Sequence, residues 1–234
     1  MIKFASIWEQ PGDPAALDRW YRTTHSREAI LFVGPWLRRY WAYRAYDAPA
    51  ETDVLGASRY RLTEMWYASE AEMQEAQAAW YPLSQPPRLL GDPSRRRIAQ
   101  IYVNAAADER FRDGWPRERT DYFRWVFFVA DPAGVEPAVA DRWFTEDFAR
   151  PLAERPEVRR LVSARAATPP TAAQPWRRMC EAWFDDYDGF RAAVLEGTYR
   201  APPWSAEFPH VPMISIFTGQ APDMDFLRDD YRAP

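Results

Sequence analysis

The sequence predicts an α+β fold made of two tandem βαββαβ repeats with antiparallel sheets. The chain has 234 residues, enough for two domains of about 100 to 120 residues each. Short segments of the first half recur in the second half in the same order, and each half mixes strand-like runs with helical periodicity. This order of elements is typical of the ferredoxin-like unit, in which both helices cover one face of the sheet.

Five segments of the first half have a counterpart in the second half. The first-half segments are IKFASIW (2–8), DRWYRTTH (18–25), LRRYWAYRA (37–45), TEMWY (63–67) and RIAQIYVN (97–104). Their counterparts are YFRWVFFV (122–129), DRWFTEDF (141–148), VRRLVSARA (158–166), CEAWF (180–184) and PMISIFTG (212–219). Each match is weak alone, but five matches in one order indicate a tandem duplication.

The elements of the first repeat follow from local signals. Strands are expected at 2–8, 37–46, 58–67 and 94–104, and helices at 14–32 and 69–80. Asp13 is a good N-cap, and Pro14 suits the first helical position of the first helix. Ser69 and Glu72 form a capping box at the start of the second helix.

The domain boundaries follow from the repeat and from a lapse of hydrophobic periodicity after the first half. We expect a first repeat at 1–108 that carries the active site, a linker at 109–120, a second repeat at 121–222 and a tail at 223–234.

Each sheet has one face without helices, and that face needs cover. The linked halves see each other at high effective concentration, so we expect the two open faces to meet within one chain around an apolar chamber. The alternative is a dimer whose halves pair between chains.

Composition excludes several classes of protein. The net charge of −4 gives no electrostatic reason to bind nucleic acid or an anionic membrane, and no apolar run approaches the roughly 18 residues of a membrane span. We therefore expect a cytoplasmic protein.

Only 9 glycines, one cysteine (Cys180) and two histidines are present, without a phosphate-binding glycine motif or a multi-cysteine metal site. We expect no cofactor. The 16% aromatic content suits a pocket for a flat apolar ligand, and equally an aromatic core.

Three motifs of the first half resemble the EthD-like family of the dimeric α/β-barrel superfamily. They are WYRTTH (20–25), GPWLRRY (34–40) and EMWYAS (64–69). The second half extends the resemblance to a tandem version. The resemblance implies cofactor-free isomerases, lyases or oxygenases of aromatic or lactone compounds, or haem-handling relatives. It also implies a cleft between helices and sheet or inside the barrel, with the motif histidine at its edge.

His25 matches that motif histidine and lies one helical turn after Tyr21. An imidazole can take and return a proton near neutral pH, so His25 is the predicted general acid/base, and its alternative role is packing at a helix end. Phe148, or Ala149 in a second alignment, takes this position in the other repeat. We therefore expect one active site per chain.

Glu64 and Glu181 occupy equivalent strand positions and could form an acid/base pair. Arg44 and Arg165 lie on the neighbouring strands, and pairing across the strands would make both carboxylates structural. The sequence favours the structural ion pairs and leaves a catalytic role for Glu64 open.

Further side chains are candidates for substrate binding. They are Trp36, Arg38, Tyr40, Trp66, Trp80 and Tyr81. Arg38 could bind a carboxylate, but its recurrence as Arg159 favours a scaffold role. His210 has no neighbouring ligand set, and Cys180 reads as a small buried hydrophobe.

These residues predict a cofactor-independent lyase or isomerase of a small aromatic or apolar metabolite, in catabolism or secondary metabolism. His25 would transfer a proton as general acid/base, which suits elimination, isomerisation and decarboxylation alike. Tyr21 or Glu64 would orient the substrate or stabilise a developing enolate or phenolate. One alternative is a cofactor-free oxygenase of an aromatic substrate. Another is a non-enzymatic protein that binds a small molecule or assists a partner oxygenase. Neither nucleic acid nor membrane is an expected partner, and a homodimer is compatible with the pattern.

Overall fold

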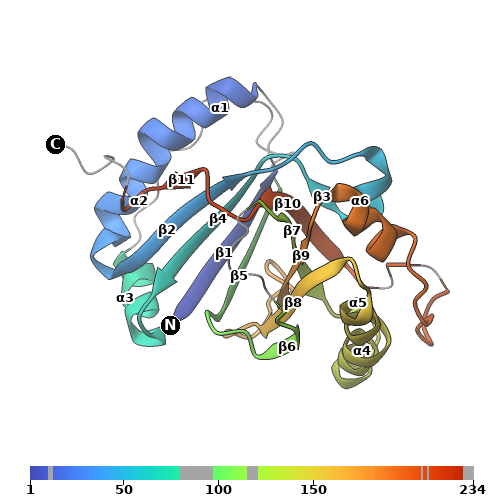
Figure 1. Ribbon diagram of the computed structural model, residues 1–234. Coiled ribbons are helices and arrows are strands. Elements are labelled where there is room, and N and C mark those ends of the chain that lie inside the picture. Colours follow the sequence, from blue (N-terminus) through green and yellow to red (C-terminus); the bar gives the residue numbers. More distant parts are fainter. Residues whose placement is uncertain (10–12, 80–96, 115–120, 207, 210, 229–234) are drawn as a thin grey trace.

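Two mainly antiparallel sheets face each other within one chain, and helices cover the outer face of each sheet (Figure 1). The computed structural model describes residues 1–9, 13–79, 97–114, 121–206, 208–209 and 211–228. In this part of the chain, the strands form one five-stranded and one six-stranded sheet and do not close into a single barrel. No described helix is long and apolar enough to cross a membrane.

The first repeat has the predicted order of elements. It comprises β1 (Ile2–Glu9), α1 (Pro14–Trp20), the π-helical η1 (Tyr21–His25), α2 (Ser26–Val33), β2 (Leu37–Arg44), β4 (Arg61–Tyr67), α3 (Glu70–Ala79) and β5 (Arg97–Asn104). Short elements between β2 and its neighbours are η2 (Gly34–Trp36), η3 (Ala50–Leu55) and β3 (Ala57–Ser58). The four long strands pair antiparallel in the spatial order β5-β1-β4-β2, which is the ferredoxin-like arrangement.

Both helices of the first repeat begin where their caps predicted. The Asp13 side chain accepts a hydrogen bond from the backbone N–H of Ala15 at 2.9 Å. The Ser69 hydroxyl accepts one from the backbone N–H of Glu72 at 3.1 Å. From Pro14 to Val33 the chain is helical throughout, with η1 as a π-helical segment in the middle.

The second repeat has the same plan. It comprises β7 (Phe123–Ala130), α4 (Pro137–Trp143), the π-helical η6 (Phe144–Ala149), α5 (Arg150–Glu154), β8 (Val158–Arg165), β9 (Trp176–Phe184), α6 (Tyr187–Phe190), the π-helical η7 (Arg191–Leu195) and β10 (Met213–Gly219). Its four long strands lie in the order β10-β7-β9-β8. The duplication extends to the π-helical segments η1 and η6, which follow the DRW sequence in both repeats. The tandem repeat predicted from the sequence is therefore present.

Short strands exchange between the repeats. β6 (Glu109–Arg112) follows the first repeat and pairs with β8, while β11 (Met224–Asp225) follows the second repeat and pairs with β2. β3 of the first half pairs parallel with β10. The sequence predicts a linker where β6 lies and a tail where β11 lies. Each sheet is thus completed by residues from the other half of the chain.

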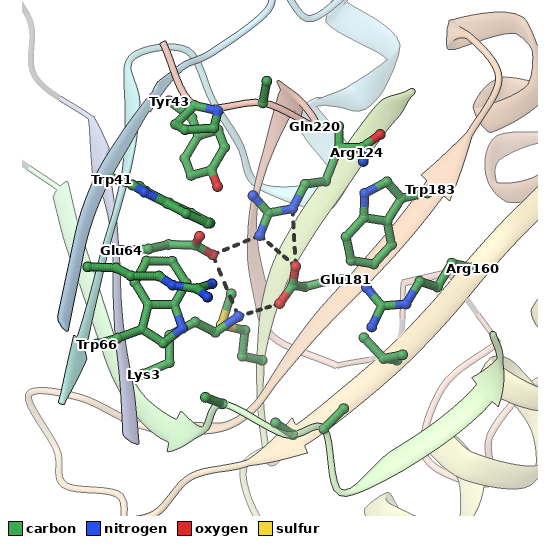
Figure 2. Close-up of a pocket in the computed structure, with 18 of the residues that line it drawn as sticks. Lys3, Trp41, Tyr43, Glu64, Trp66, Arg124, Arg160, Glu181, Trp183 and Gln220 are labelled. Atoms are coloured by element: carbon green, nitrogen blue, oxygen red, sulfur yellow. Dashed lines mark hydrogen bonds and ion pairs between the residues drawn. The ribbon is translucent and has the colours of Figure 1, made fainter. Parts of the chain in front are cut away.

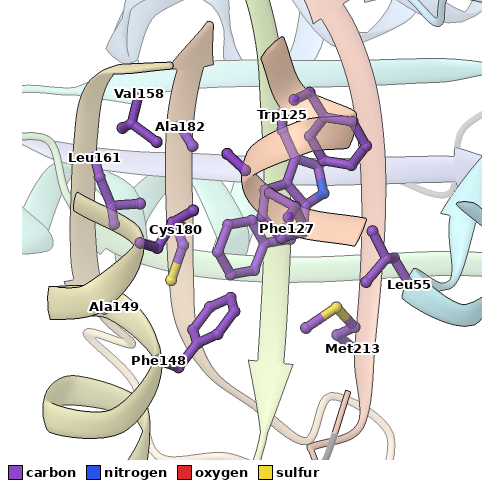
Figure 3. Packing of buried hydrophobic residues seen from close by; sticks show 14 of the residues in the cluster. Leu55, Trp125, Phe127, Phe148, Ala149, Val158, Leu161, Cys180, Ala182 and Met213 are labelled. Atoms are coloured by element: carbon purple, nitrogen blue, oxygen red, sulfur yellow. The ribbon is translucent and has the colours of Figure 1, made fainter. Parts of the chain in front are cut away.

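The inner faces of the two sheets pack against each other, as expected for pairing within one chain. The buried residues between them include Ile7, Leu62, Ile101, Val126, Phe128, Ile214 and Ile216. An isolated β-bridge between Val103 and Ala166 also links the sheets. A further core lies between each sheet and its helices, and Figure 3 shows the one in the second repeat.

Candidate functional site

The residues that the sequence grouped into one site lie on opposite faces of the first sheet. Alternate residues of a strand point to opposite faces. On β4, Thr63 faces the helices with Tyr21 and His25, whereas Glu64 faces the second sheet. The structure therefore brings His25 and Tyr21 together and separates them from Glu64.

On the helix-covered face, seven polar or aromatic side chains gather in what we call the polar interface. They are Ser6, Trp8, Trp20, Tyr21, His25, Tyr40 and Thr63. The ring of His25 lies 5.1 Å from that of Trp8, 5.0 Å from that of Trp20 and 5.3 Å from that of Tyr21, between centroids. The predicted pairing of His25 with Tyr21 along one helical flank is thus correct. Both side chains are buried.

One hydrogen bond joins a phenol of the polar interface to the sheet. The hydroxyl of Tyr21 and that of Thr63 are 2.5 Å apart, whereas the hydroxyl of Tyr40 has no hydrogen-bond partner among the described residues. The guanidinium of Arg61 lies 4.7 Å from the centroid of the Tyr21 ring. Burial raises the pKa of Tyr21 and raises that of Tyr40 well above its usual value. Both phenols are therefore neutral hydrogen-bond donors at physiological pH.

Burial also sets the protonation state of His25. It lowers the pKa of the imidazole to about 4, and the nearby Glu28 only partly opposes this shift. The imidazole is therefore neutral at physiological pH. A neutral imidazole beside neutral phenols can accept a proton while the hydroxyls donate to an oxygen of a bound molecule.

Five buried polar atoms of the polar interface have no hydrogen-bond partner among the described residues. They are Ser6 Oγ, Trp8 Nε1, Trp20 Nε1, His25 Nδ1 and the Tyr40 hydroxyl. Buried polar groups in native proteins are nearly always paired, and an unpaired group calls for a specific explanation such as a ligand or a bound water.

The second repeat shows what the same backbone looks like without these groups. The strand registers pair Ser6 with Thr63 and Phe127 with Cys180, which makes the two pairs equivalent. In the second repeat, hydrocarbon or thiol side chains occupy six of the seven positions that form the polar interface in the first repeat. They are Phe127, Val129, Phe144, Phe148, Leu161 and Cys180. Figure 3 shows four of them within one apolar cluster: Phe127, Phe148, Leu161 and Cys180.

One aromatic position keeps its residue type in both repeats but not its hydrogen bonding. Trp143, the counterpart of Trp20, donates its indole N–H to the carbonyl of Arg200 at 2.8 Å. Among the described residues of this second core, Trp125 alone has an unpaired buried polar side-chain atom, its indole nitrogen. The excess of unpaired groups is thus a property of the first repeat.

The other face of the first sheet borders a cavity of about 420 Å³ between the two sheets (Figure 2). Four charged residues meet there, which we call the charge quartet: the buried Lys3, Glu64 and Arg124, and the partly buried Glu181. Arg124 donates to Glu64 at 2.7 Å and to Glu181 at 2.5 Å, while Lys3 pairs with Glu181 and lies 3.6 Å from Glu64. The chamber is therefore charged rather than apolar as predicted, and His25 does not face it.

The quartet holds the carboxylate of Glu181 in the ionised form. Burial alone would raise the pKa of Glu181, but Arg124 and Lys3 lower it below the usual range for a glutamate. The two symmetry-related glutamates thus do come together, as the sequence allowed. Their partners are the cations of the first strand of each repeat.

The predicted ion pairs of Arg44 and Arg165 with the glutamates are wrong. Arg44 points to the helix-covered face and pairs with Asp18, which also binds Arg61 at 2.6 Å. Arg165 likewise binds Asp141 at 2.8 Å. These carboxylates lie on the first helix of each repeat, so the arginines tie helix to sheet. The spacing of these residues along the sequence did not reveal which face of the sheet each side chain takes.

The remaining predicted residues divide between cavity, surface and core. Trp66 lines the cavity between the sheets, and Cys180 is buried in the second core. Trp36 donates to Glu75 at 3.0 Å, and Arg38 binds Glu72 at 2.7 and 2.9 Å, both at the surface beside α3. The predictions for Trp80, Tyr81 and His210 lie outside the described residues.

Two functional candidates escaped the sequence analysis. Lys3 and Arg124 are each the second residue of the first strand of their repeat, β1 or β7, and each is a lone cation within an apolar run. Charge at the same position of both copies was the available signal. Ser6 gave no such signal, since a serine within a strand is unremarkable in sequence.

The cavity between the sheets does not fit a haem. In the described part of the chain it is lined by neither histidine nor cysteine, so it offers no such axial ligand to a haem iron. Nor do the described residues include a cluster of three or more metal-ligating side chains. The expectation that the protein needs no cofactor remains a prediction.

Comparisons with known proteins relate this chain to others of its fold. The family model "Chalcone isomerase N-terminal domain" matches residues 7–83, about a third of the chain. This is not the EthD-like family that the motifs resemble. No protein with a curated description matches.

Two solved structures illustrate the fold comparison. An anthrone oxidase-like protein superposes with a TM-score of 0.52 at 12% identity, over 93% of this chain and 90% of that one. Chlorite dismutase from Candidatus Nitrospira defluvii, in complex with imidazole, superposes with a TM-score of 0.49 at 8% identity, over 93% and 90%. At such identities the likeness is one of fold alone. The strand orders and the likeness to the anthrone oxidase-like protein together show a two-repeat ferredoxin-like fold.

Proposed function

We propose that the protein is a cofactor-independent isomerase that moves a proton within a small planar aromatic carbonyl compound at the polar interface. One observation carries this proposal: five buried polar atoms of the polar interface lack partners among the described residues, at positions where the second repeat has mainly hydrocarbon side chains. Unpaired groups of this kind cost stability, so their retention in one copy favours a ligand that pairs with them.

The chemistry of the side chains supports proton transfer. Nδ1 of His25 accepts a proton from an acidic position of the substrate, such as a phenol. The neutral hydroxyls of Tyr21 and Tyr40 donate hydrogen bonds to the carbonyl oxygen, where negative charge develops. The imidazolium of His25, with a pKa of about 4, then returns the proton to a carbon of the same molecule. The substrate gains and loses one proton, so the net reaction is an isomerisation.

The family match supports the reaction class. Its range of 7–83 contains six of the seven residues of the polar interface, and its printed description names an isomerase of chalcones, which are planar aromatic ketones. The same site also suits the two alternatives predicted from the sequence. An aromatic anion formed at His25 could react with dioxygen, and a binding protein would hold the ligand without converting it.

The test uses 2′-hydroxychalcone, whose phenol adds to its own double bond while a proton moves to the carbon beside the carbonyl, giving flavanone. We expect the wild-type protein to form flavanone equally under air and under argon. His25→Phe, which installs the residue of the second repeat, is expected to lower kcat/KM by about 10²- to 10⁴-fold. Arg38→Gln serves as control and is expected to retain wild-type activity, because Arg38 lies at the surface with Glu72.

Other outcomes assign the alternatives. Conversion that requires dioxygen indicates the oxygenase, and tight binding without conversion indicates the binding protein. A folded His25→Phe variant that retains kcat/KM within about threefold of wild type contradicts the assignment of His25, since loss of a general acid/base normally costs far more.

A further inference from the structure

We propose that the cavity between the sheets is a second ligand site, which binds a small planar aromatic carboxylate. This site is independent of the proposed function. It lies on the opposite face of the first sheet and shares no lining residue with the polar interface.

The cavity has the size and the walls of a small-molecule site. Its volume of about 420 Å³ falls in the range of about 300 to 1,000 Å³ that is usual for such pockets. Trp41, Trp66 and Trp183 line it, and the rings of Trp41 and Trp66 meet edge to face with centroids 4.7 Å apart. Indole faces and edges suit a flat aromatic ring.

The charges of the lining favour an anion. Four cations, Lys3, Arg39, Arg124 and Arg160, face two carboxylates, Glu64 and Glu181. Within the charge quartet the two signs balance, so the excess positive charge belongs to Arg39 and Arg160. A bound carboxylate would compensate this excess.

The two excess arginines are equivalent in the duplication but differ in their partners. Arg39 pairs in register with Trp66, as Arg160 does with Trp183, and each guanidinium lies over that indole. Arg160 binds the carboxylate of Asp113 at 3.0 Å. In the described part of the chain, Arg39 has no carboxylate partner. The carboxylate of the ligand would thus do for Arg39 what Asp113 does for Arg160.

The charge quartet sets the orientation of the ligand. Lys3 and Arg124 are already paired with Glu64 and Glu181, so the anionic group binds Arg39 and the ring lies between the indoles. Gln220 also lines the cavity, and its buried Oε1 has no partner in the described structure. Its amide can hydrogen-bond to a polar substituent on the ring.

The test titrates 2-naphthoate and its neutral analogue 2-naphthamide into the protein, followed by calorimetry and tryptophan fluorescence. We expect saturable binding of 2-naphthoate, and binding of 2-naphthamide weaker by at least about tenfold, because a charge-assisted hydrogen bond is worth about 1.5 to 3 kcal/mol. Arg39→Gln should raise the Kd of 2-naphthoate by a similar factor. The matched control Arg38→Gln makes the same charge change at the adjacent residue, which faces away from the cavity, and should leave the Kd within about twofold of wild type.

Three results would overturn the proposal: no saturable binding at 2-naphthoate concentrations up to about 1 mM, equal Kd values for Arg39→Gln and Arg38→Gln, or loss of binding in His25→Phe. The last result would place the ligand at the polar interface instead. Because Arg39 and Arg38 are both exposed, neither variant is expected to perturb folding. Failure of the isomerase assay does not affect this titration.

Discussion

The helix–sheet interfaces of the two repeats have the same backbone plan and opposite chemistry. The second repeat packs Phe127 against Phe148 with ring centroids 6.3 Å apart, whereas the first repeat has Ser6 and His25 at these positions. Hydrocarbon packing stabilises, and an unpaired buried polar group costs about 1 to 3 kcal/mol. The comparison indicates that the second copy is kept for stability and that the first copy gives up stability for its polar groups.

The charge quartet provides the opposite comparison, since both repeats contribute to it equally. Each supplies one cation and one glutamate at equivalent positions: Lys3 with Glu64, and Arg124 with Glu181. Shared features of this kind hold the two sheets together, whereas features of one copy are candidates for function.

The largest effect is expected at the quartet. Arg124→Met leaves Glu64 and Glu181 with Lys3 as their only quartet cation, and removal of one partner of a buried ion pair typically costs about 3 to 5 kcal/mol. Lys3→Met should cost less, because Arg124 still donates to both carboxylates. Urea unfolding measures both. Equal stability of Arg124→Met and wild type would show that the quartet is not the link between the sheets.

A somewhat smaller effect is expected from the titration of His25. Its pKa is about 4 in the folded protein against about 6.5 when unfolded, so the unfolded state binds more protons between these values. Wild-type stability should therefore fall by up to about 3 kcal/mol relative to His25→Phe as the pH drops from 7 to 4. Parallel stability curves for the two proteins, from urea unfolding at a series of pH values, would contradict the burial of a neutral imidazole.

The smallest effect concerns the Tyr21–Thr63 hydrogen bond. Tyr21→Phe installs the residue of the second repeat and leaves the buried Thr63 hydroxyl without this partner, at a cost of about 1 to 3 kcal/mol. Tyr21→Phe/Thr63→Cys installs the complete second-repeat pair and should recover part of this loss. Thermal unfolding of the single and double variants measures the coupling. Strictly additive losses would mean that the two hydroxyls do not interact.

The fold was predictable because local signals agreed with the duplication. The Asp13 cap, the Ser69 capping box and the repeated strand segments all indicated the observed elements. The exchange of β6 and β11 between the repeats was not predictable, since such short strands depend on tertiary contacts rather than on their own sequence. Phe226, fully buried directly after β11, is an anchor that no periodicity indicated.

The site was predictable only in part. His25 and Tyr21 were linked by their spacing along one helix, and the structure brings them together. Glu64 was assigned to the same site because the pattern of a fully buried strand does not reveal which face each residue takes. All seven residues of β4 are buried, so alternation of polar and apolar residues could not separate the face of Thr63 from that of Glu64.

The most direct test of the polar interface as a ligand site is ¹⁵N NMR of histidine-labelled protein. The chain has only two histidines, and His25→Phe assigns the signals of His25. At saturation with 2′-hydroxychalcone, judged independently by fluorescence, we predict that the Nδ1 resonance of His25 shifts as its unpaired nitrogen gains a partner. An unchanged Nδ1 resonance at saturation would contradict the assignment of this interface as the site.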